Sequence, residues 1–288
     1  MKEFKIVVGL EIGSDFLRAA EVEHREDRFF LSRVAETKLL SLDTDELVQK
    51  ISLLVNEEGI LGRIASVSVD TTLTERDTIE LDDDLQSQEI ANFLKAEINL
   101  HSDFEGREYR PAYEITKSSG NGYNEVFYAA LEKSLLSFVK DACTRCGLDL
   151  QYIDIDHSCS ELTVNKLQPK LRTCILVTVK NKQIEGSFIK NGERIVYRYL
   201  SYSGEPFYFV TKMARDLETL AKKYAEKIFV TGTAADNFLI QLLQKNADKR
   251  YELLVPTQDL LLSPIVSSNT KLKTAPHHFS SVIGAAIK

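Results

Sequence analysis

The sequence predicts an α/β fold built twice, in which mixed five-stranded sheets are flanked by helices. The first observation is a three-strand unit that occurs at residues 6–37 and again at 174–201. The second is that each half follows the order β-β-β-α-β-α. The third is that the first half contains extra material that the second half lacks.

The two copies of the three-strand unit share one pattern and differ at their first turn. The strands fall at 6–12, 17–22 and 29–34 in the first copy, and at 174–179, 184–189 and 195–200 in the second. The first copy turns at Gly13-Ser14, whereas the second turns at Lys180-Asn181. Because glycine lets a backbone approach a phosphate closely, this difference suggests a nucleotide-binding plan that has partly decayed.

Caps and glycines mark the helices of the first half. A helix over 42–55 begins near Asp43 and stops at Gly59, and a helix over 132–146 stops at Gly147. We also expect a helix at 157–167, a loop at 117–124 and strands at 65–69, 71–81, 110–116, 125–131 and 150–155. A further helix should start at Asp82-Asp83-Asp84 and bury Ile90, Phe93, Leu94 and Ile98.

The second half repeats the plan in fewer residues. We expect helices at 205–224 and 234–244, strands at 227–230 and 252–255, a polar irregular stretch at 257–274 and a closing helix with a small-residue face at 279–287. The polar stretch 166–172 is the best domain boundary. The sequence therefore predicts one domain at 1–170 and a second at 171–288.

Composition narrows the class of protein. The chain has 288 residues with 43% apolar and 27% charged side chains, which is typical of globular domains. A net charge of −7 argues against nucleic acid as a partner. The chain has no apolar run of membrane-spanning length and no signal peptide, which favours the cytoplasm. We interpret Cys143 and Cys146 as ordinary buried thiols rather than a redox or zinc pair, because no second close pair follows.

The run Gly9-Leu10-Glu11-Ile12-Gly13-Ser14 resembles the first phosphate loop of the actin, Hsp70 and sugar-kinase ATPases. The order of elements over nearly the whole chain is similar to FtsA and especially to PilM of type IV pilus assembly, with the cytoplasmic part of GspL of type II secretion as a related alternative. The resemblance implies two actin-like (ribonuclease H-like) domains, with about 71–128 as the small inserted α+β subdomain. The second domain lacks most of the insertion usual in the family.

The resemblance also marks the positions at which a nucleotide would bind. They are Glu11, Gly13, Ser14, Thr178, Lys180, Thr231 and Gly232. Three departures affect them: Glu11 replaces an aspartate, Thr178-Val179-Lys180 replaces Asp-x-Gly, and one glycine remains at the adenosine loop. We therefore expect no catalytic residue, metal or resident cofactor. The alternative is a protein that binds or hydrolyses ATP with Mg²⁺.

Partner contacts in this family involve the inserted subdomain. In PilM it helps to bind the cytoplasmic N-terminal tail of a membrane-anchored pilus protein, which implies a cytoplasmic scaffold held at the inner membrane by its partner. The polar strand at 71–78, which we expect to be exposed, is our candidate for pairing with such a tail. Its proposed contact residues are Thr72, Thr74, Arg76 and Thr78. An ordinary edge strand protected by charges is the alternative, and homo-oligomers, such as the filaments of FtsA, stay open.

Two other motifs favour structural roles. The run 154–159, Asp-Ile-Asp-His-Ser-Cys, contains nucleophile and base types, but catalytic triads form by spatial convergence, so we expect a strand end with Asp156 as helix N-cap. His277-His278 follows Pro276 and predicts a helix entry, because neighbouring helical residues point about 100° apart and make a poor metal site.

Overall fold

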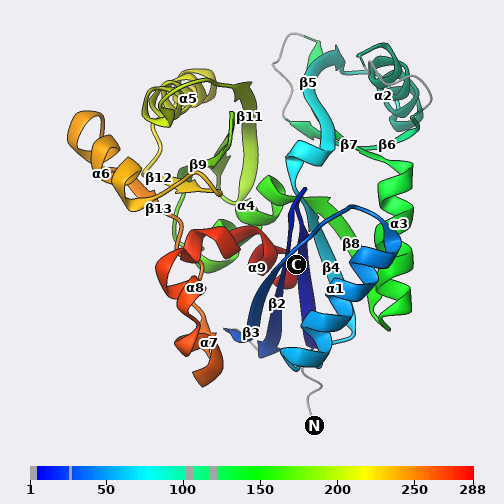
Figure 1. Cartoon of the computed structure of the whole chain (residues 1–288). Helices are drawn as coiled ribbons and strands as arrows, with labels where there is room; N and C mark the ends of the chain where they lie inside the picture. Colours follow the sequence, from blue (N-terminus) through cyan, green and yellow to red (C-terminus); the bar gives the residue numbers. More distant parts are fainter. Residues whose placement is uncertain (1–4, 26–27, 102–106, 117–121) are drawn as a thin grey trace.

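Three sheets and their helices make up the molecule (Figure 1). The computed structural model describes residues 5–25, 28–101, 107–116 and 122–288. The predicted α/β architecture with a duplicated strand unit is confirmed. None of the helices among the described residues is long and apolar enough to cross a membrane.

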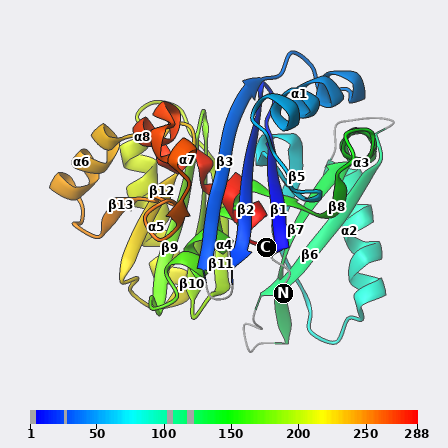
Figure 2. The same ribbon diagram turned by 90° about the horizontal axis from the view of Figure 1, so that it is seen from below.

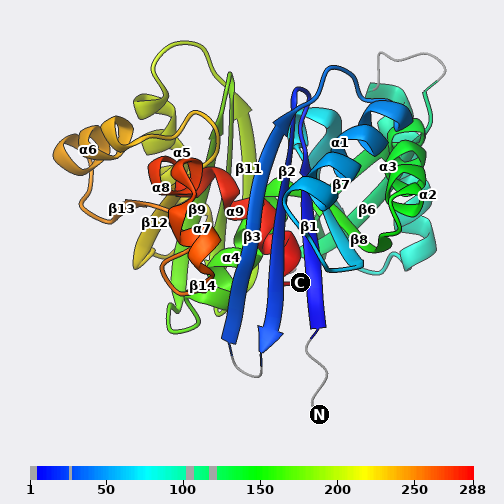
Figure 3. The same cartoon turned by 60° about the horizontal axis from the view of Figure 1, so that its bottom comes forward.

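The first sheet has the order β14-β3-β2-β1-β4-β8. Its strands are β1 (Lys5–Ile12), β2 (Phe16–Arg25), β3 (Arg28–Lys38), β4 (Ile64–Val69), β8 (Asp149–Ile155) and β14 (Leu261–Leu262). β1 pairs antiparallel with β2 and parallel with β4, which makes the sheet mixed as predicted. The expectation of five strands is wrong by one, because the two-residue β14 adds to the edge of β3 (Figure 3).

The second sheet repeats the central pattern of the first, with the order β11-β10-β9-β12-β13. Its strands are β9 (Thr173–Lys180), β10 (Gln183–Lys190), β11 (Glu193–Ser201), β12 (Lys227–Thr231) and β13 (Tyr251–Leu253). β9 pairs antiparallel with β10 and parallel with β12, just as β1 pairs with β2 and β4. The turns after β1 and β9 therefore occupy equivalent places in the two sheets.

The third sheet forms the inserted unit, with the order β5-β7-β6. It consists of β5 (Thr74–Asp82), β6 (Tyr109–Thr116) and β7 (Tyr123–Glu132), covered by helix α2 (Ser87–His101). The prediction that this strand begins at Thr71 is wrong, because Thr71–Leu73 forms a 3₁₀ turn, η1. Most of the predicted loop 117–124 lies outside the described residues.

Helix α2 begins later than its acidic run suggested. Asp82 ends β5 by pairing with Tyr123, and the helix starts at Ser87. Ile90, Leu94 and Ile98 are buried as predicted. Phe93 is 44% exposed, so its predicted burial is wrong.

Helices cover both faces of the first two sheets. They are α1 (Thr44–Glu57), α3 (Lys133–Arg145), α4 (Asp156–Leu167), α5 (Pro206–Ala221) and α6 (Asn237–Asn246). α1 and α3 pack on the outer face of the first sheet (Figure 2), and α5 and α6 pack on one face of the second. Asp43 caps α1 as predicted, with its carboxylate accepting from the Glu46 amide. α5 ends three residues before the predicted Tyr224, because Lys222 adopts a left-handed conformation.

The segment after β13 is helical rather than irregular, which corrects the expectation for 257–274. It contains α7 (Pro264–Ser268), α8 (Thr270–Thr274), the 3₁₀ turn η2 (Pro276–Phe279) and α9 (Ser280–Ala286). The predicted closing helix and the helix entry at His277-His278 are confirmed. α9 is fully buried between the first sheet and α4. Gly9 and Gly284 make this possible, because a Cβ on either would overlap a backbone carbonyl, of Val282 or Cys159 respectively.

The four cysteines are free thiols, as expected. Cys143, Cys159 and Cys174 are buried and Cys146 is partly buried. Burial raises the pKa of Cys143 to about 12, which keeps it as an unreactive thiol at neutral pH.

Candidate functional site

The ends of β1 and β9 converge on one cavity between the first two sheets. Five of the seven nucleotide positions expected from the sequence line it, namely Glu11, Thr178, Lys180, Thr231 and Gly232. Gly13 and Ser14 are not among its lining residues. Asp70, at the end of β4, and Asp156, at the start of α4, complete the same wall.

The inter-sheet cavity is small. Its volume is about 20 Å³, which leaves room for about one water molecule. Sites for small organic ligands typically measure about 300–1,000 Å³. In this conformation the protein's own side chains therefore fill the space between the two sheets.

Lys180 lies at the centre of the side chains that fill this space. Its Nζ atom lies 2.5 Å from Asp156 Oδ2 and 2.9 Å from Asp70 Oδ1. It also lies 3.4 Å from Glu185 Oε1 and donates a hydrogen bond to the Thr71 hydroxyl. The Lys180 side chain is 6% exposed, so a buried ammonium group is surrounded by oxygen atoms. Burial of a charge is tolerated when it is paired and hydrogen-bonded in this way.

A second cation, Arg76 of β5, extends this group of charges. Its Nη2 atom lies 3.3 Å from Glu185 Oε1, and its Nε donates to the Tyr197 hydroxyl. Tyr197 in turn donates to Glu185 at 2.9 Å. We call the set the Lys180 cluster, which consists of Asp70, Thr71, Arg76, Asp156, Lys180 and Glu185. Its members come from the segment that follows β4, from β5, β9 and β10, and from α4, so the cluster ties these parts together.

Carboxylates outnumber cations in the Lys180 cluster by three to two. Burial raises the pKa of Asp156 to about 7, and the neighbouring Asp70 and Glu185 add to that rise against the opposing effect of Lys180. Burial also acts to raise the pKa of Glu185, but Lys180 and Arg76 outweigh it and lower that pKa to about 2. Uptake of a proton by Asp156 is therefore favoured, and it offsets the excess negative charge of the cluster.

Glu11 is engaged by an arginine rather than open to a metal-bound water. Its Oε2 lies 3.3 Å from Arg18 Nη1, and Arg18 also pairs with Glu36 at 2.7 Å. The Arg18 guanidinium lies 4.2 Å from the centre of the Phe16 ring, a cation–π distance. A Cβ on Gly13 would overlap that ring, so this glycine makes room for Phe16.

Gly232, which the sequence resemblance assigns to an adenosine loop, also contacts the protein itself. Gly232 has a φ of +99°, and a Cβ there would overlap the backbone of Val179. The amide of Ala234 donates to the Val179 carbonyl at 3.0 Å, which holds the two loops together. Gly13 and Gly232 thus both have a packing role that requires no ligand.

The run 154–159 also differs from its predicted role. Asp156 is the first residue of α4 and its carboxylate faces Lys180, so its prediction as N-cap is wrong; Ile155 holds that position. His157 is buried, with Nδ1 2.8 Å from the Thr178 hydroxyl and Nε2 3.0 Å from the Ser187 hydroxyl. The sequence reasoning missed Asp70 and Glu185, and it expected Arg76 to contact a partner rather than this cluster. The available signal was Lys180 itself, since a lysine at a buried turn needs carboxylate partners.

The predicted partner strand is an edge strand but is only partly open. Thr72 is exposed and Thr78 is partly buried. Thr74 and Arg76 are 9% and 8% exposed, so the expectation of an exposed strand is wrong for these two residues. The reason is that this end of β5 packs against the second sheet through the Lys180 cluster.

An open groove runs instead between β6 and β8, the edge strands of the third and first sheets. It consists of two adjoining cavities of about 620 and 460 Å³. Ala112 of β6 and Ile153 of β8 line both cavities, which makes them halves of one β6–β8 groove. Leu131, Leu136, Leu148 and Leu150 supply apolar surface in the larger half.

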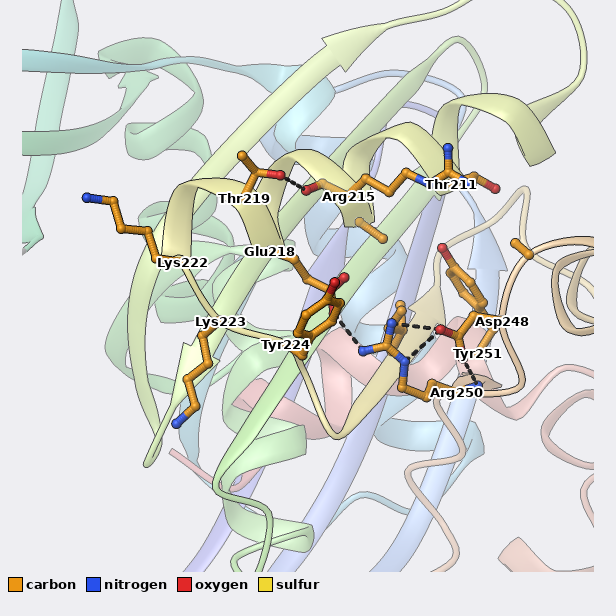
Figure 4. Close-up of a pocket in the computed structure, with 13 residues that line it drawn as sticks. Thr211, Arg215, Glu218, Thr219, Lys222, Lys223, Tyr224, Asp248, Arg250 and Tyr251 are labelled. Carbon is orange, nitrogen blue, oxygen red and sulfur yellow. Dashed lines mark hydrogen bonds and ion pairs between the residues drawn. The ribbon is translucent and has the colours of Figure 1, made fainter.

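A further pocket of about 600 Å³ lies between α5 and β13 (Figure 4). Its central cation, Arg250, is paired with Glu218 at 2.6 Å and Asp248 at 2.7 Å. Lys222 and Lys223 extend away from Arg250 in Figure 4. Because the central cation of this pocket already has two carboxylate partners, we regard the β6–β8 groove as the better candidate for binding a partner.

The chain has the actin-like ATPase fold. A solved PilM–PilN type IV pilus biogenesis complex matches it with a TM-score of 0.74 and 16% identity, over 98% of this chain and 97% of that chain. A Bacteroides thetaiotaomicron protein of unknown function with an actin-like ATPase fold has a TM-score of 0.53 and 10% identity, over 88% and 91% of the two chains.

The cytoplasmic domain of EpsL, an inner-membrane component of the Vibrio cholerae type II secretion system, gives a TM-score of 0.48 and 11% identity, over 98% of this chain and 95% of that chain. No protein-family model and no curated protein sequence matches the chain.

Proposed function

We propose that the protein is an actin-fold scaffold of a pilus or secretion assembly that binds an extended segment of a membrane-anchored partner and does not use nucleotide. The partner segment is a cytoplasmic N-terminal tail, and it holds the scaffold at the inner membrane. The likeness to the PilM–PilN complex, an actin fold solved with its assembly partner, motivates the choice of class. Because one fold can serve many functions, the proposal also needs support from the geometry of a binding site.

The observation that carries the proposal is the β6–β8 groove. Both strands end their sheets and therefore present unpaired main-chain groups, onto which an extended peptide can add as a further strand. Pro111 of β6 lacks a donor, which makes β8 the better edge for pairing. The seven residues of β8 give an edge of about 23 Å at about 3.3 Å per residue.

Variants that fill the groove test this proposal. Ala112 is exposed and lines both halves of the groove, so Ala112→Tyr inserts a ring without changing charge or disturbing the core. Synthetic cytoplasmic tails of the membrane-anchored proteins encoded beside this chain serve as probes in fluorescence polarisation. We expect one tail to bind the original chain and to lose most of its affinity for Ala112→Tyr.

Thr72→Tyr is the matched control, since Thr72 is exposed beside β5, the strand that the sequence predicts as the binding site for the tail. Binding that survives Ala112→Tyr but not Thr72→Tyr would place the tail at β5 instead. Failure of every encoded tail to bind would overturn the scaffold function. The identity of the tail that binds separates a pilus protein from a GspL-like secretion component.

The alternative function, an ATP-binding or ATP-hydrolysing protein, is favoured by the fold and opposed by the filled cavity. A site with micromolar Kd would gain about 4 kcal/mol of stability at millimolar Mg-ATP, because ligand binding to the folded state stabilises it by mass action. For a chain of this size that gain raises Tm by roughly 10 °C. We expect a thermal shift assay to give no measurable change. A rise of several degrees would establish the alternative.

A further inference from the structure

The two halves of the β6–β8 groove differ in charge. Arg110, Lys140 and Asp149 line the larger half and carry a net positive charge. The smaller half has four carboxylates and two cations. These are Glu114, Asp154, Glu161, Glu193, Arg194 and Lys288. A segment lying along the groove therefore meets a positive end and a negative end.

Ion pairs match most of the charges at the negative end. Arg194 binds the buried Glu161 through two nitrogens, with Nη2 2.6 Å and Nε 2.9 Å from the carboxylate oxygens. Lys288 Nζ lies 2.7 Å from Asp154 Oδ2. Each of the two cations thus already has a close carboxylate partner.

Glu114 of β6 is the second carboxylate that pairs with Arg194, whose charge Glu161 already neutralises. Its Oε2 lies 3.1 Å from Arg194 Nη1, and its side chain is 52% exposed toward the groove. Partial burial raises the pKa of Glu114, and Glu161 and Asp154 add to the rise against the effect of Arg194. The surroundings of Glu114 therefore carry more negative than positive charge.

We propose that the Glu114 end of the groove binds a basic side chain, lysine or arginine, of the partner segment. This inference rests on the proposed function and adds the chemistry by which the segment is selected. Cytoplasmic segments that flank membrane spans carry an excess of Lys and Arg, so a basic residue is available in such a partner. The opposite charges at the two ends of the groove also fix the direction in which the segment lies.

Peptide selection against the full-length chain tests the inference without a known partner. A phage-displayed library of ten-residue peptides is panned on the original chain and counter-selected on Ala112→Tyr, so that only groove-dependent peptides are kept. We expect these peptides to be enriched in Lys or Arg near one end. Groove-dependent peptides without that enrichment would overturn the inference and leave the scaffold function standing, whereas a failure to recover any would overturn both.

A charge exchange then identifies Glu114 as the contact. Glu114→Gln should weaken a selected basic peptide roughly tenfold, since a charged hydrogen bond contributes about 1.5 kcal/mol. Asp216→Asn, an exposed change on α5, is the matched control and should have no effect. Glu114→Lys should bind the peptide whose basic residue is changed to Glu better than the original peptide. A purely structural role for Glu114 predicts equal losses for both peptides and overturns the inference.

Discussion

Lys180 stands where the actin-fold phosphate loop is expected to have a glycine. A lysine in such a place could in principle attract a phosphate by its charge. Here Asp70, Asp156 and Glu185 surround its ammonium group, so a phosphate would have to displace three carboxylates. The same residue that removes backbone access to a ligand thereby holds the sheets together.

The loss of this cation tests how strongly the cluster is coupled to folding. Lys180→Ala leaves three buried carboxylates with Arg76 alone, and breaking a buried ion pair from one side costs about 3–5 kcal/mol. We expect urea unfolding to show a loss of that size. Lys190→Ala, at the exposed end of β10, is the control and should change stability by less than about 0.5 kcal/mol. Equal effects of the two substitutions would show that the cluster contributes nothing.

Glu161 predicts a pH dependence. Burial acts to raise its pKa, but Arg194 and His157 lower it to about 2, below its ordinary 4.5. A folded-state pKa that is depressed contributes stability that is present above pH 4.5 and is lost as the pH falls toward 2. We expect Glu161→Gln to be destabilised by roughly 3 kcal/mol at pH 7, with the difference from the original chain shrinking below pH 4.5. Urea unfolding between pH 3 and 7 measures it, and a constant difference would contradict the assignment.

At the scale of elements, the regular strands and capped helices were predictable from the sequence. The hairpins show period-two alternation, and Asp43 and Gly147 mark helix ends in the expected way. The start of α2 was missed because the acidic run at 82–84 is typical of a helix N-terminus. In the structure Asp82 instead pairs with Tyr123 as the last residue of β5. Helices α7 and α8 were missed because five residues are too few to establish a helical period.

The candidate site was only partly predictable, for a related reason. Glu11, Thr178, Lys180, Thr231 and Gly232 could be brought together because the duplicated unit fixes where equivalent turns lie. Asp70 and Arg76 could not, because they lie in the first half of the chain and only tertiary packing brings them to the Lys180 cluster. Glu185 was missed although it lies on β10, which pairs with the strand of Lys180. The β6–β8 groove is likewise formed by two strands that do not pair with each other.

Because α9 is closely packed, we expect a substitution in it to change stability in the direction opposite to that given by helix propensity. Gly→Ala within a helix ordinarily gains about 1 kcal/mol. At Gly284 the new methyl group would overlap the Cys159 carbonyl of α4, so we expect Gly284→Ala to lose about 3 kcal/mol or more. Gly204→Ala is the control, since Gly204 faces open space at a φ of +95° and should lose only about 1 kcal/mol. A gain in Tm for Gly284→Ala would refute this account of the α4–α9 contact.

At the scale of the whole molecule, the segment after β13 completes the core of the first sheet. Ala20, Val22, Leu31 and Val34 of β2 and β3 pack against Val266, Leu272, Val282 and Ile283. β14 adds to β3, and α9 separates the first sheet from α4. The two halves of the sequence are therefore not independent in space, although each supplies its own central strands.

Removal of residues 257–288 should abolish cooperative folding. The truncated chain loses α9 and exposes the apolar face of β2 and β3, which costs roughly 25 cal/mol for each Å² of apolar surface returned to water. We expect circular dichroism to show a broad thermal transition and the dye ANS to bind, as in loosely packed states. A sharp melt close to that of the full chain would show that the first sheet is complete without this segment.

The burial of α9 has a consequence for how the protein is made. Ribosomes deliver the chain from the N-terminus, so β1 to β4 emerge long before residues 280–286. Until residues 280–286 leave the exit tunnel, the nascent first sheet lacks the helix that fills its inner face. Packing of the first sheet must therefore wait for α9, and during that interval chaperones and proteases compete for an apolar surface that the folded molecule buries.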